Sequence, residues 1–312
     1  MAKNNPTIGV VLMTYGSATT ADNVVEYMEH VYPKGVPVGL IEDFQERYRL
    51  VGRSPLIDIT KAQAAATEKL LLATHKSARY IVRAGMLHSH PFIAEVVAEL
   101  AAAKADALVG VVLAPQYSPL IMKGYLTTLQ EEAAKAGFAP EDVVVAEPWG
   151  AEPNFVELLV TRLREKLEEL RTKYGAHPPI IFTTHSLPER VVKKDPRYLE
   201  QLKETVTSVV AKIDPALEWH MAYQSAGHTP EAWLKPDLVD VLADVRKAKK
   251  APGVLIIPLQ FLADHLEILY DLDMAGGEQC RDYGLEYNRI ELPNTHPLFI
   301  KSLAAIVAGA SA

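Results

Sequence analysis

Short apolar runs rich in valine and isoleucine recur along the chain, and amphipathic segments of helical length separate most of them. This alternation is typical of parallel α/β proteins, in which a helix carries the chain back between neighbouring strands. Runs such as VGVVLAP and VLIIPLQF are continuously apolar, as strands buried on both faces are. The expected strands are Thr7 to Thr14, Arg79 to Met86, Ala107 to Ala114 and Val143 to Glu147, then Pro179 to Thr184, Glu218 to Tyr223, Val254 to Pro258 and Arg289 to Leu292.

Four strands in each half of the chain predict two similar α/β domains, each with a four-stranded parallel sheet flanked by helices. The length of 312 residues agrees, because a domain usually holds about 100–200. We expect the boundary near Pro148 to Pro153. Helices are expected at Asn154 to Thr172, at Pro236 to Lys249 and at His296 to Ala308, and the sequence does not assign the last to either domain.

Composition and charge exclude several classes of protein. Apolar residues make up 49% and charged residues 23%, which argues against disordered and fibrous chains. A formal net charge of -7 leaves no broad basic surface for phosphates, so nucleic acid is not an expected partner. The longest uncharged stretch, Ala107 to Met122, is shorter than the roughly 20 residues that span a bilayer. We expect no transmembrane segment, while peripheral membrane contact stays open.

The number of cysteines and the N-terminal sequence both indicate the cellular compartment of the protein. Cys280 is the one cysteine, so a single chain can form neither a disulfide nor a four-cysteine iron–sulfur cluster. The start, MAKNNPTIGVVLMTYG, leads into the first expected strand and carries no A-x-A site of the secretory type, so we read it as mature sequence. The expected protein is cytoplasmic and has no iron–sulfur cluster.

Ligand-capable side chains follow the expected strands. In parallel sheets, ligands bind beyond the carboxyl ends of the strands. One histidine at a strand end is more often structural than a ligand, but here histidines recur in both halves. The signatures GxGxxG, GxxxxGK[ST] and GxSxG are missing, which argues against nucleotide binding and serine hydrolysis. The strand-end segments are Met13 to Ser17, His88 to Pro91, Pro115 to Ser118, Thr184 to Pro188, Gln224 to His228 and Gln260 to His265.

An acidic segment, Ala263 to Asp273, holds four carboxylates and no lysine or arginine. On a helix, Asp264, Glu267 and Asp271 would share one face at positions i, i+3 and i+7. Three like charges in a line repel each other unless a cation or solvent screens them. The face is therefore either a solvated helix start favoured by the helix dipole or a path for metal ions, and the pattern leaves both open.

Several ordered motifs resemble those of one family. The chain is similar to bacterial ferrochelatases over nearly its whole length, especially the small coproporphyrin type. The resemblance implies the class II chelatase fold, in which two Rossmann-like domains face each other across a porphyrin cleft and the C-terminal helix returns to the first domain. The domains would then span residues 1–148 with 293–312, and 149–292. The motifs are MTYGSA, ERYRLVGRSPLIDIT, GMLHSHPFI, LAPQYS, IIFTTHSLPER, QSAGHTPEAWLKPDL and FLADHLEILYDLD.

The resemblance implies an enzyme of haem biosynthesis. It would be a lyase that inserts Fe²⁺, as substrate, into coproporphyrin III and releases coprohaem and two protons, with no permanently bound cofactor. Tyr15 favours coproporphyrin III, because protoporphyrin-type members usually read LGTP at that point. Protoporphyrin IX, a sirohydrochlorin-type ring and a non-catalytic haem or metal carrier stay open. We expect a monomer with transient contacts to neighbouring enzymes of the haem pathway.

The resemblance also implies roles for the second-half residues. His185, in THSLP, matches the family's inner metal residue, and Glu267, in DHLE, matches its partner. A neutral imidazole can bind Fe²⁺ or accept a proton, so both roles of His185 stay open. Asp271 matches a further acidic residue on the metal path.

The outer part of that metal path departs from the family pattern. One carboxylate of the family's acidic ladder is Ala275 here, so Asp273 or Glu278 would have to substitute for it. On the first domain, Tyr15 matches a tyrosine beneath the macrocycle, where it would either supply an oxygen ligand to the metal or pack against the ring.

Porphyrin propionates need hydrogen-bond donors, and an acidic protein must supply them locally. The family uses the positions of Ser54 and Tyr125 in this way, and Tyr48 is a further candidate. For Arg53 and Lys123, a solvated surface charge explains the residue equally well. The predicted substrate-binding set is Met13, Tyr15, Arg47, Arg53, Ser54, His88, Lys123, Tyr125 and Trp233, the last packing the cleft edge.

Overall fold

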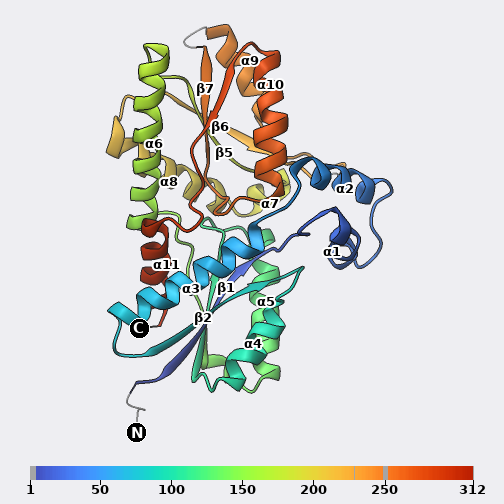
Figure 1. Ribbon diagram of the computed structural model, residues 1–312, viewed down its shortest axis with the longest axis vertical. Coiled ribbons are helices and arrows are strands. Elements are labelled where there is room, and N and C mark those ends of the chain that lie inside the picture. Colours follow the sequence, from blue (N-terminus) through green and yellow to red (C-terminus); the bar gives the residue numbers. More distant parts are fainter. Residues whose placement is uncertain (1–4, 228, 249–251, 312) are drawn as a thin grey trace.

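The computed structural model describes residues 5–227, 229–248 and 252–311, and it contains two parallel sheets. Predictions that extend to Met1–Asn4, His228, Lys249 and Ala312 lie outside the described residues. The first sheet has the order β2-β1-β3-β4 and the second β6-β5-β7-β8, so both halves follow the same topology (Figure 1). The prediction of two four-stranded parallel sheets is confirmed. The strands are β1 Thr7–Thr14, β2 Arg79–Met86, β3 Ala107–Val112, β4 Val143–Val145, β5 Ile180–His185, β6 Trp219–Gln224, β7 Gly253–Pro258 and β8 Glu286–Arg289.

The expected bounds of the last strand are wrong, whereas the other seven lie within two residues of those observed. The prediction of Arg289 to Leu292 followed the apolar residues Ile290 and Leu292, which are buried but lie beyond the strand. The paired residues are instead the polar Glu286–Arg289, in register with Gly253 to Ile256. An edge strand pairs on one side only, so its backbone can pair without apolar side chains.

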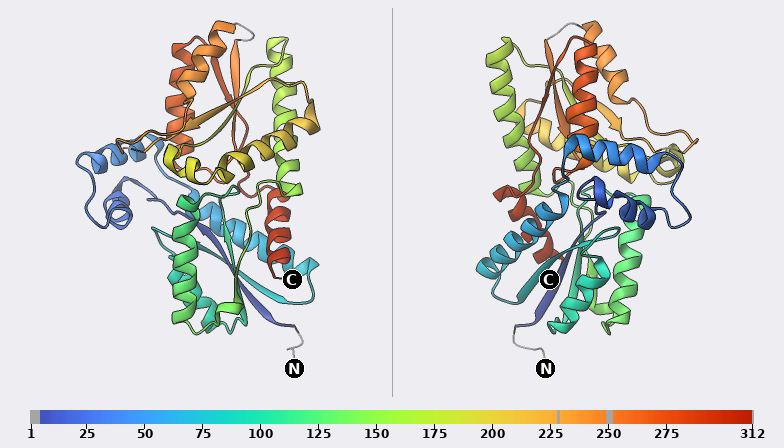
Figure 2. Two further views of the ribbon diagram at one scale, coloured as in Figure 1. Left: turned by 180° about the vertical axis from the view of Figure 1, so that it is seen from behind. Right: turned by 45° about the vertical axis from the view of Figure 1, so that its right-hand side comes forward.

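Helices cover both faces of each sheet, as the alternating pattern predicts (Figure 1, Figure 2). The segment that follows Leu266 is a π-helix, labelled η3, which continues into α10. The helices are α1 Val24–Val31, α2 Leu40–Val51, α3 Leu56–Thr74, α4 Ile93–Ala102, α5 Pro119–Lys135, α6 Pro153–Tyr174, α7 Glu189–Lys194, α8 Arg197–Ile213, α9 Leu238–Ala248, η3 Glu267–Gly276, α10 Gly277–Asp282 and α11 Pro297–Ala310, with 3₁₀ turns η1 Ala21–Asn23 and η2 Pro140–Asp142.

The packing of these helices follows from side-chain alternation along the strands. In the first sheet, one face of β1 packs on α4 and α5 and the other on α3 and α11. In the second sheet, one face of β5 packs on α6 and α8, and the other packs with α9, η3 and α10. None of the described helices is long and apolar enough to cross a membrane.

One hydrophobic core runs through both domains. Trp149 packs on Phe155 of α6 and on Phe299 of α11, with ring centroids 5.3 and 6.1 Å apart. The indole Nε1 of Trp149 donates to the carbonyl oxygen of Val112 at the end of β3, 3.1 Å away. Helix α11 contacts α3 beside the first sheet and α6 beside the second, so its assignment to the first domain stays a prediction.

Replacing Phe299 by alanine should destabilise the whole chain, because the ring is fully buried where the two domains share their core. The expected loss is about 3–5 kcal/mol of unfolding free energy, measured by urea denaturation. Lys301→Ala, on an exposed position of the same helix, is the control and should change stability by less than about 0.5 kcal/mol. Equal stability of the two variants would contradict the shared core.

Candidate active site

A cavity of about 1050 Å³ lies between the two domains, at the carboxyl ends of their strands. The residues that follow β1 line one side of it, and the ends of β5, β6 and β7 line the other. Helices α1 and α2 lie beside the junction of the two domains and contribute Met28, Phe44 and Arg47 to the wall (Figure 1, Figure 2). The expected location of the site at the strand ends therefore coincides with a cavity.

His185 ends β5 and presents a free ring nitrogen to the cavity. Its Nδ1 lies 2.6 Å from the carbonyl oxygen of Ser186. A carbonyl can only accept, so Nδ1 carries the hydrogen and the neutral ring keeps a lone pair on Nε2. This Nε2 lies 3.8 Å from Oε2 of Glu267, which is too far for a hydrogen bond. The atom is thus free to bind a metal ion or take a proton.

Glu267 is the first residue of the π-helix η3 and lies between the buried side chains of Leu266 and Ile268. Its Oε2 is buried and has no hydrogen-bond partner among the described residues. A buried polar atom without a partner is costly, and such atoms are retained mainly at functional sites or where water or an ion binds. The space between Glu267 and His185 can therefore hold a water molecule or an ion.

Asp271, four residues further along η3, has two hydrogen-bond partners. The hydroxyl of Ser225 donates to its Oδ2 at 2.7 Å, and the Arg47 guanidinium lies 3.4 Å from its Oδ1. Arg47 also lies over the ring of Tyr270, 5.1 Å from the centroid. Burial raises the pKa of Asp271, and the charge of Glu267 adds to this, while Ser225 and Arg47 act in the opposite direction. Helix α2 thus supplies a cation to the acidic segment.

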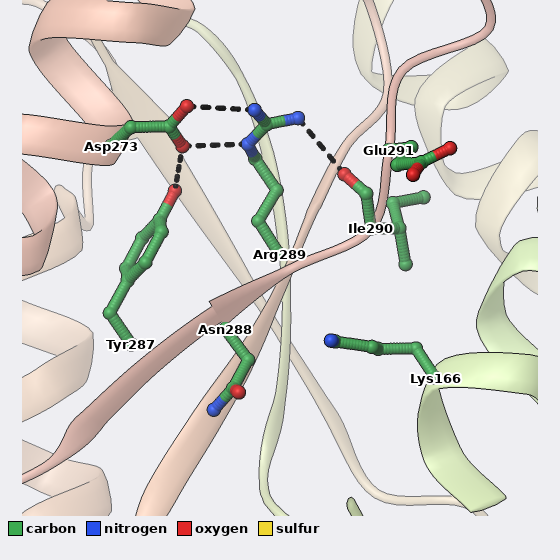
Figure 3. A pocket seen from close by; sticks show the side chains of 7 residues that line it. All are labelled: Lys166, Asp273, Tyr287, Asn288, Arg289, Ile290 and Glu291. Atoms are coloured by element: carbon green, nitrogen blue, oxygen red, sulfur yellow. Dashed lines mark hydrogen bonds and ion pairs between the residues drawn. The ribbon is translucent and has the colours of Figure 1, made fainter. Parts of the chain in front are cut away.

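The expected alignment of three carboxylates on one helix face is wrong. The helix begins at Glu267, so Asp264 lies in the preceding loop, where its Oδ2 accepts from Asn294 at 2.7 Å. Asp273 is not among the residues that line the cavity. It forms two 2.7 Å hydrogen bonds with Arg289, which Figure 3 draws as dashed lines. Both carboxylates are paired with residues more than a dozen positions away, which a local pattern does not reveal. Glu278 is not among the residues that line the cavity, so neither Asp273 nor Glu278 is placed to extend the metal path.

Apart from Arg47, the first-domain wall is formed by uncharged side chains. Tyr15, 44% exposed, follows β1, and its ring lies 4.4 Å from that of His88. Burial by the surrounding protein raises the pKa of Tyr15 to about 12, with smaller contributions from Tyr32 and Glu267. Burial, followed by the nearby His30, lowers the pKa of His88 to about 4. Tyr15 therefore keeps its proton at neutral pH and His88 is uncharged.

Hydroxyl groups continue this wall. Ser54 is buried, and its Oγ lies 3.2 Å from Oγ of Ser17, which lines the cavity. Tyr48 and Tyr125 also line the cavity, and burial raises the pKa of both phenols. These side chains are hydrogen-bond donors in a region with few charges.

Of the other predicted substrate-binding residues, one lines the cavity and three do not. Trp233 lines the cavity and stacks over Gly227, where a Cβ atom would lie 2.6 Å from the indole ring. Met13, Arg53 and Lys123 are not among the lining residues. Met13 is buried in the core beside α4 and α5, Arg53 pairs with Asp58 at 2.5 Å, and Lys123 is exposed on α5.

Two glutamines that were not predicted flank His185 on the neighbouring strands. Gln224 ends β6 in register with His185, and Gln260 follows β7. Both line the cavity, and neither amide atom of Gln224 has a partner among the described residues, although only 7% of the residue is exposed. Their positions directly after apolar runs were the available signal, and attention to histidines alone missed it.

Known proteins match this chain in sequence and in fold. The family model described as Ferrochelatase matches residues 7–311. The chain is 33% identical to the coproporphyrin III ferrochelatase of Oceanobacillus iheyensis over 302 residues, 96% of each chain. It is 32% identical to that of Bacillus subtilis, again over 96% of each. In fold, it resembles SirB from Bacillus subtilis, solved with Fe³⁺, with a TM-score of 0.60 at 10% identity and coverage of 98% and 96%. The predicted class II chelatase fold is confirmed.

The environment of His88 predicts a pH effect on stability. With a pKa of about 4 in the folded chain against 6.5 in the unfolded chain, His88 favours folding above pH 6.5, and this contribution is lost as the pH falls to 4. The stability difference between wild type and His88→Gln should therefore shrink over that range, measured by denaturation at several pH values. NMR titration of the His88 ring near pH 6.5 would contradict the assignment.

Proposed function

The chain belongs to the ferrochelatase family and is a metal chelatase of haem biosynthesis, and on that premise we propose that it inserts Fe²⁺ into coproporphyrin III. The products would be coprohaem and two protons. The observation that carries this proposal is the pair formed by Nε2 of His185 and Oε2 of Glu267 in the wall of a cavity shared by both domains.

The geometry of this pair suits a metal ion in transit. Bonds from imidazole nitrogen or carboxylate oxygen to a divalent ion are about 2.0–2.2 Å long, so one ion fits between atoms 3.8 Å apart. In the described part of the chain, no group of three or more His, Cys, Asp or Glu side chains is placed to hold an ion. The pair would therefore share Fe²⁺ with water and then with the pyrrole nitrogens, which favours transfer over storage.

The pyrrole protons need acceptors on the same or the opposite side of the ring. The unpartnered Oε2 of Glu267 is one acceptor, and Nε2 of His185 would be the second once its lone pair no longer binds Fe²⁺. Tyr15 and His88 would lie on the other face of the macrocycle, where the protonated phenol of Tyr15 packs on the ring or turns its oxygen to the metal. The ring would thus lie between walls that belong to different domains.

The donors on the first-domain side support a substrate with several carboxylates. Ser17, Tyr48 and Tyr125 line the cavity, and Ser54 lies directly behind Ser17. A phenol or hydroxyl can donate to a propionate without adding a charge to the cavity. Arg47 adds a guanidinium that is shared with Asp271. Two curated relatives named coproporphyrin III ferrochelatases point to the same substrate.

The remaining parts of the proposal concern the protein as a whole. Fe²⁺ would be a substrate, with no cofactor bound between turnovers. The protein would act in the cytoplasm as a monomer that meets its neighbours in the haem pathway transiently.

Anaerobic Fe²⁺ insertion, followed by absorbance with coproporphyrin III and protoporphyrin IX in parallel, tests the substrate. Coproporphyrin III should turn over faster, because its additional propionates meet the hydroxyl donors of the cavity. Faster turnover of protoporphyrin IX would support metal insertion but overturn the assignment of coproporphyrin III as the substrate. Stoichiometric binding of both rings without turnover would indicate a carrier.

Removing either member of the central pair should stop metal insertion. His185→Ala should reduce turnover at least about 100-fold. Porphyrin should still bind, as measured by fluorescence quenching, because the porphyrin ring packs mainly on other residues. Glu267→Gln should slow turnover strongly for lack of a charged acceptor. His90→Gln, outside the cavity lining, is the control. Turnover of His185→Ala at the wild-type rate would refute the assigned role.

A further inference from the structure

Two buried hydroxyl groups lie directly behind His185. The phenol of Tyr198, from α8, lies 2.9 Å from the carbonyl oxygen of His185 and 2.7 Å from Oγ1 of Thr184. Both hydroxyls also lie 3.2 Å from Oε1 of Gln260. Tyr198 is almost fully buried and is not among the cavity-lining residues. The network therefore reaches the cavity only through His185 and Gln260.

The end of the β-ladder explains why His185 needs this partner. The carbonyl of Thr183 accepts from the backbone of Leu259, and the pairing of β5 with β7 ends there, at Pro258. The carbonyl of His185, two residues further on, points to the same side, because the direction of the carbonyl groups along a strand repeats every second residue. No β7 residue is paired with it there, and Tyr198 supplies the donor instead. The His185–Ser186 peptide is thus held at both ends: its N–H donates to the carbonyl oxygen of Gln224 at 2.7 Å, and its carbonyl accepts from the side chain of Tyr198.

Counting hydrogens fixes the direction of the bonds. The two hydroxyls provide two hydrogens, and the two carbonyl oxygens, on His185 and Gln260, can only accept. The two shortest contacts take these hydrogens: Thr184 donates to the phenol of Tyr198 at 2.7 Å, and Tyr198 donates to the carbonyl of His185 at 2.9 Å. Because burial raises the pKa of Tyr198, the phenol keeps its hydrogen throughout the neutral range. The side-chain amide of Gln260 lies 3.2 Å from both hydroxyl oxygens and packs against this chain of bonds.

We propose that Tyr198, with Thr184, is the positioning residue that fixes His185 and Gln260 at the cavity, and through them sets the rate of metal insertion. Tyr198 holds the peptide that follows His185, and the next carbonyl, on Ser186, holds Nδ1 of the same ring. Together with the bond from the Ser186 N–H to Gln224, these bonds hold the ring with Nε2 at 3.8 Å from Oε2 of Glu267. This inference rests on the proposed function for its kinetic consequence but not for its structural one.

The test is Tyr198→Phe, which removes the hydroxyl and keeps the ring. The matched control is Tyr80→Phe, which removes another buried hydroxyl, 3.3 Å from Ser311 and outside the cavity lining. Tyr198→Phe should lower kcat about 10-fold to 100-fold with the KM for porphyrin unchanged, since a small misplacement of a reacting group is costly. Tyr80→Phe should keep both values. Equal kcat in the two variants would overturn the proposal.

A second readout separates positioning from general loss of structure. In ¹⁵N NMR of the His185 ring, wild type should show hydrogen on Nδ1, and Tyr198→Phe should show a mixture of tautomers. A fall in kcat without this change would also overturn the proposal. Thr184→Val tests the same network if Tyr198→Phe fails to fold, and should give a smaller loss of kcat because Tyr198 keeps its bond to His185. If wild type turns over neither porphyrin, the proposed function fails, while the tautomer measurement still decides the positioning role.

Discussion

The shared core at Trp149, Phe155 and Phe299 is the contact on which the rest of the structure depends. Because α6 and α11 belong to one continuous core, the two sheets are held with their carboxyl ends toward the same cavity. A flexible linker would leave the separation of the walls undefined. Here buried aromatic rings define it, and with it the distance across the cavity from Tyr15 on one wall to His185 and Glu267 on the other.

Charge is distributed unevenly around this cavity, and the causes are local. On the first-domain wall, burial keeps Tyr15 protonated and His88 neutral. On the second-domain wall, Asp271 has Arg47 and Ser225 as partners, whereas Oε2 of Glu267 has none among the described residues. The uncharged Tyr15 and His88 on the first-domain wall suit an apolar macrocycle. On the second-domain wall, the negative charge of Glu267 lies beside the lone pair of His185, where a cation would be attracted most strongly.

The sequence predicts much of this arrangement, and the predictions fail where the deciding contact is not visible in a local pattern of residues. Apolar runs located seven of the eight strands, the edge strands β2, β4 and β6 included, but the edge strand β8 consists of Glu286–Arg289, which give no such signal. The acidic segment looked unpartnered because Arg47 and Arg289 lie far from it along the chain. The pairing of His185 with Glu267 came from family motifs, since no periodicity joins residues so far apart. Tyr198 was missed because an ordinary helix pattern does not show which residue reaches a strand end.

The two halves share one topology but supply different chemistry at equivalent positions. Strand β1 holds the same place in the first sheet as β5 does in the second, and Tyr15 follows β1 where His185 ends β5. Equivalent strand ends that face one cavity thus carry an aromatic phenol on one side and a metal-binding imidazole on the other. Under the proposed function, this asymmetry gives the reaction its direction: the ring packs on the uncharged side chains Tyr15 and His88, and Fe²⁺ approaches from the wall that carries Glu267.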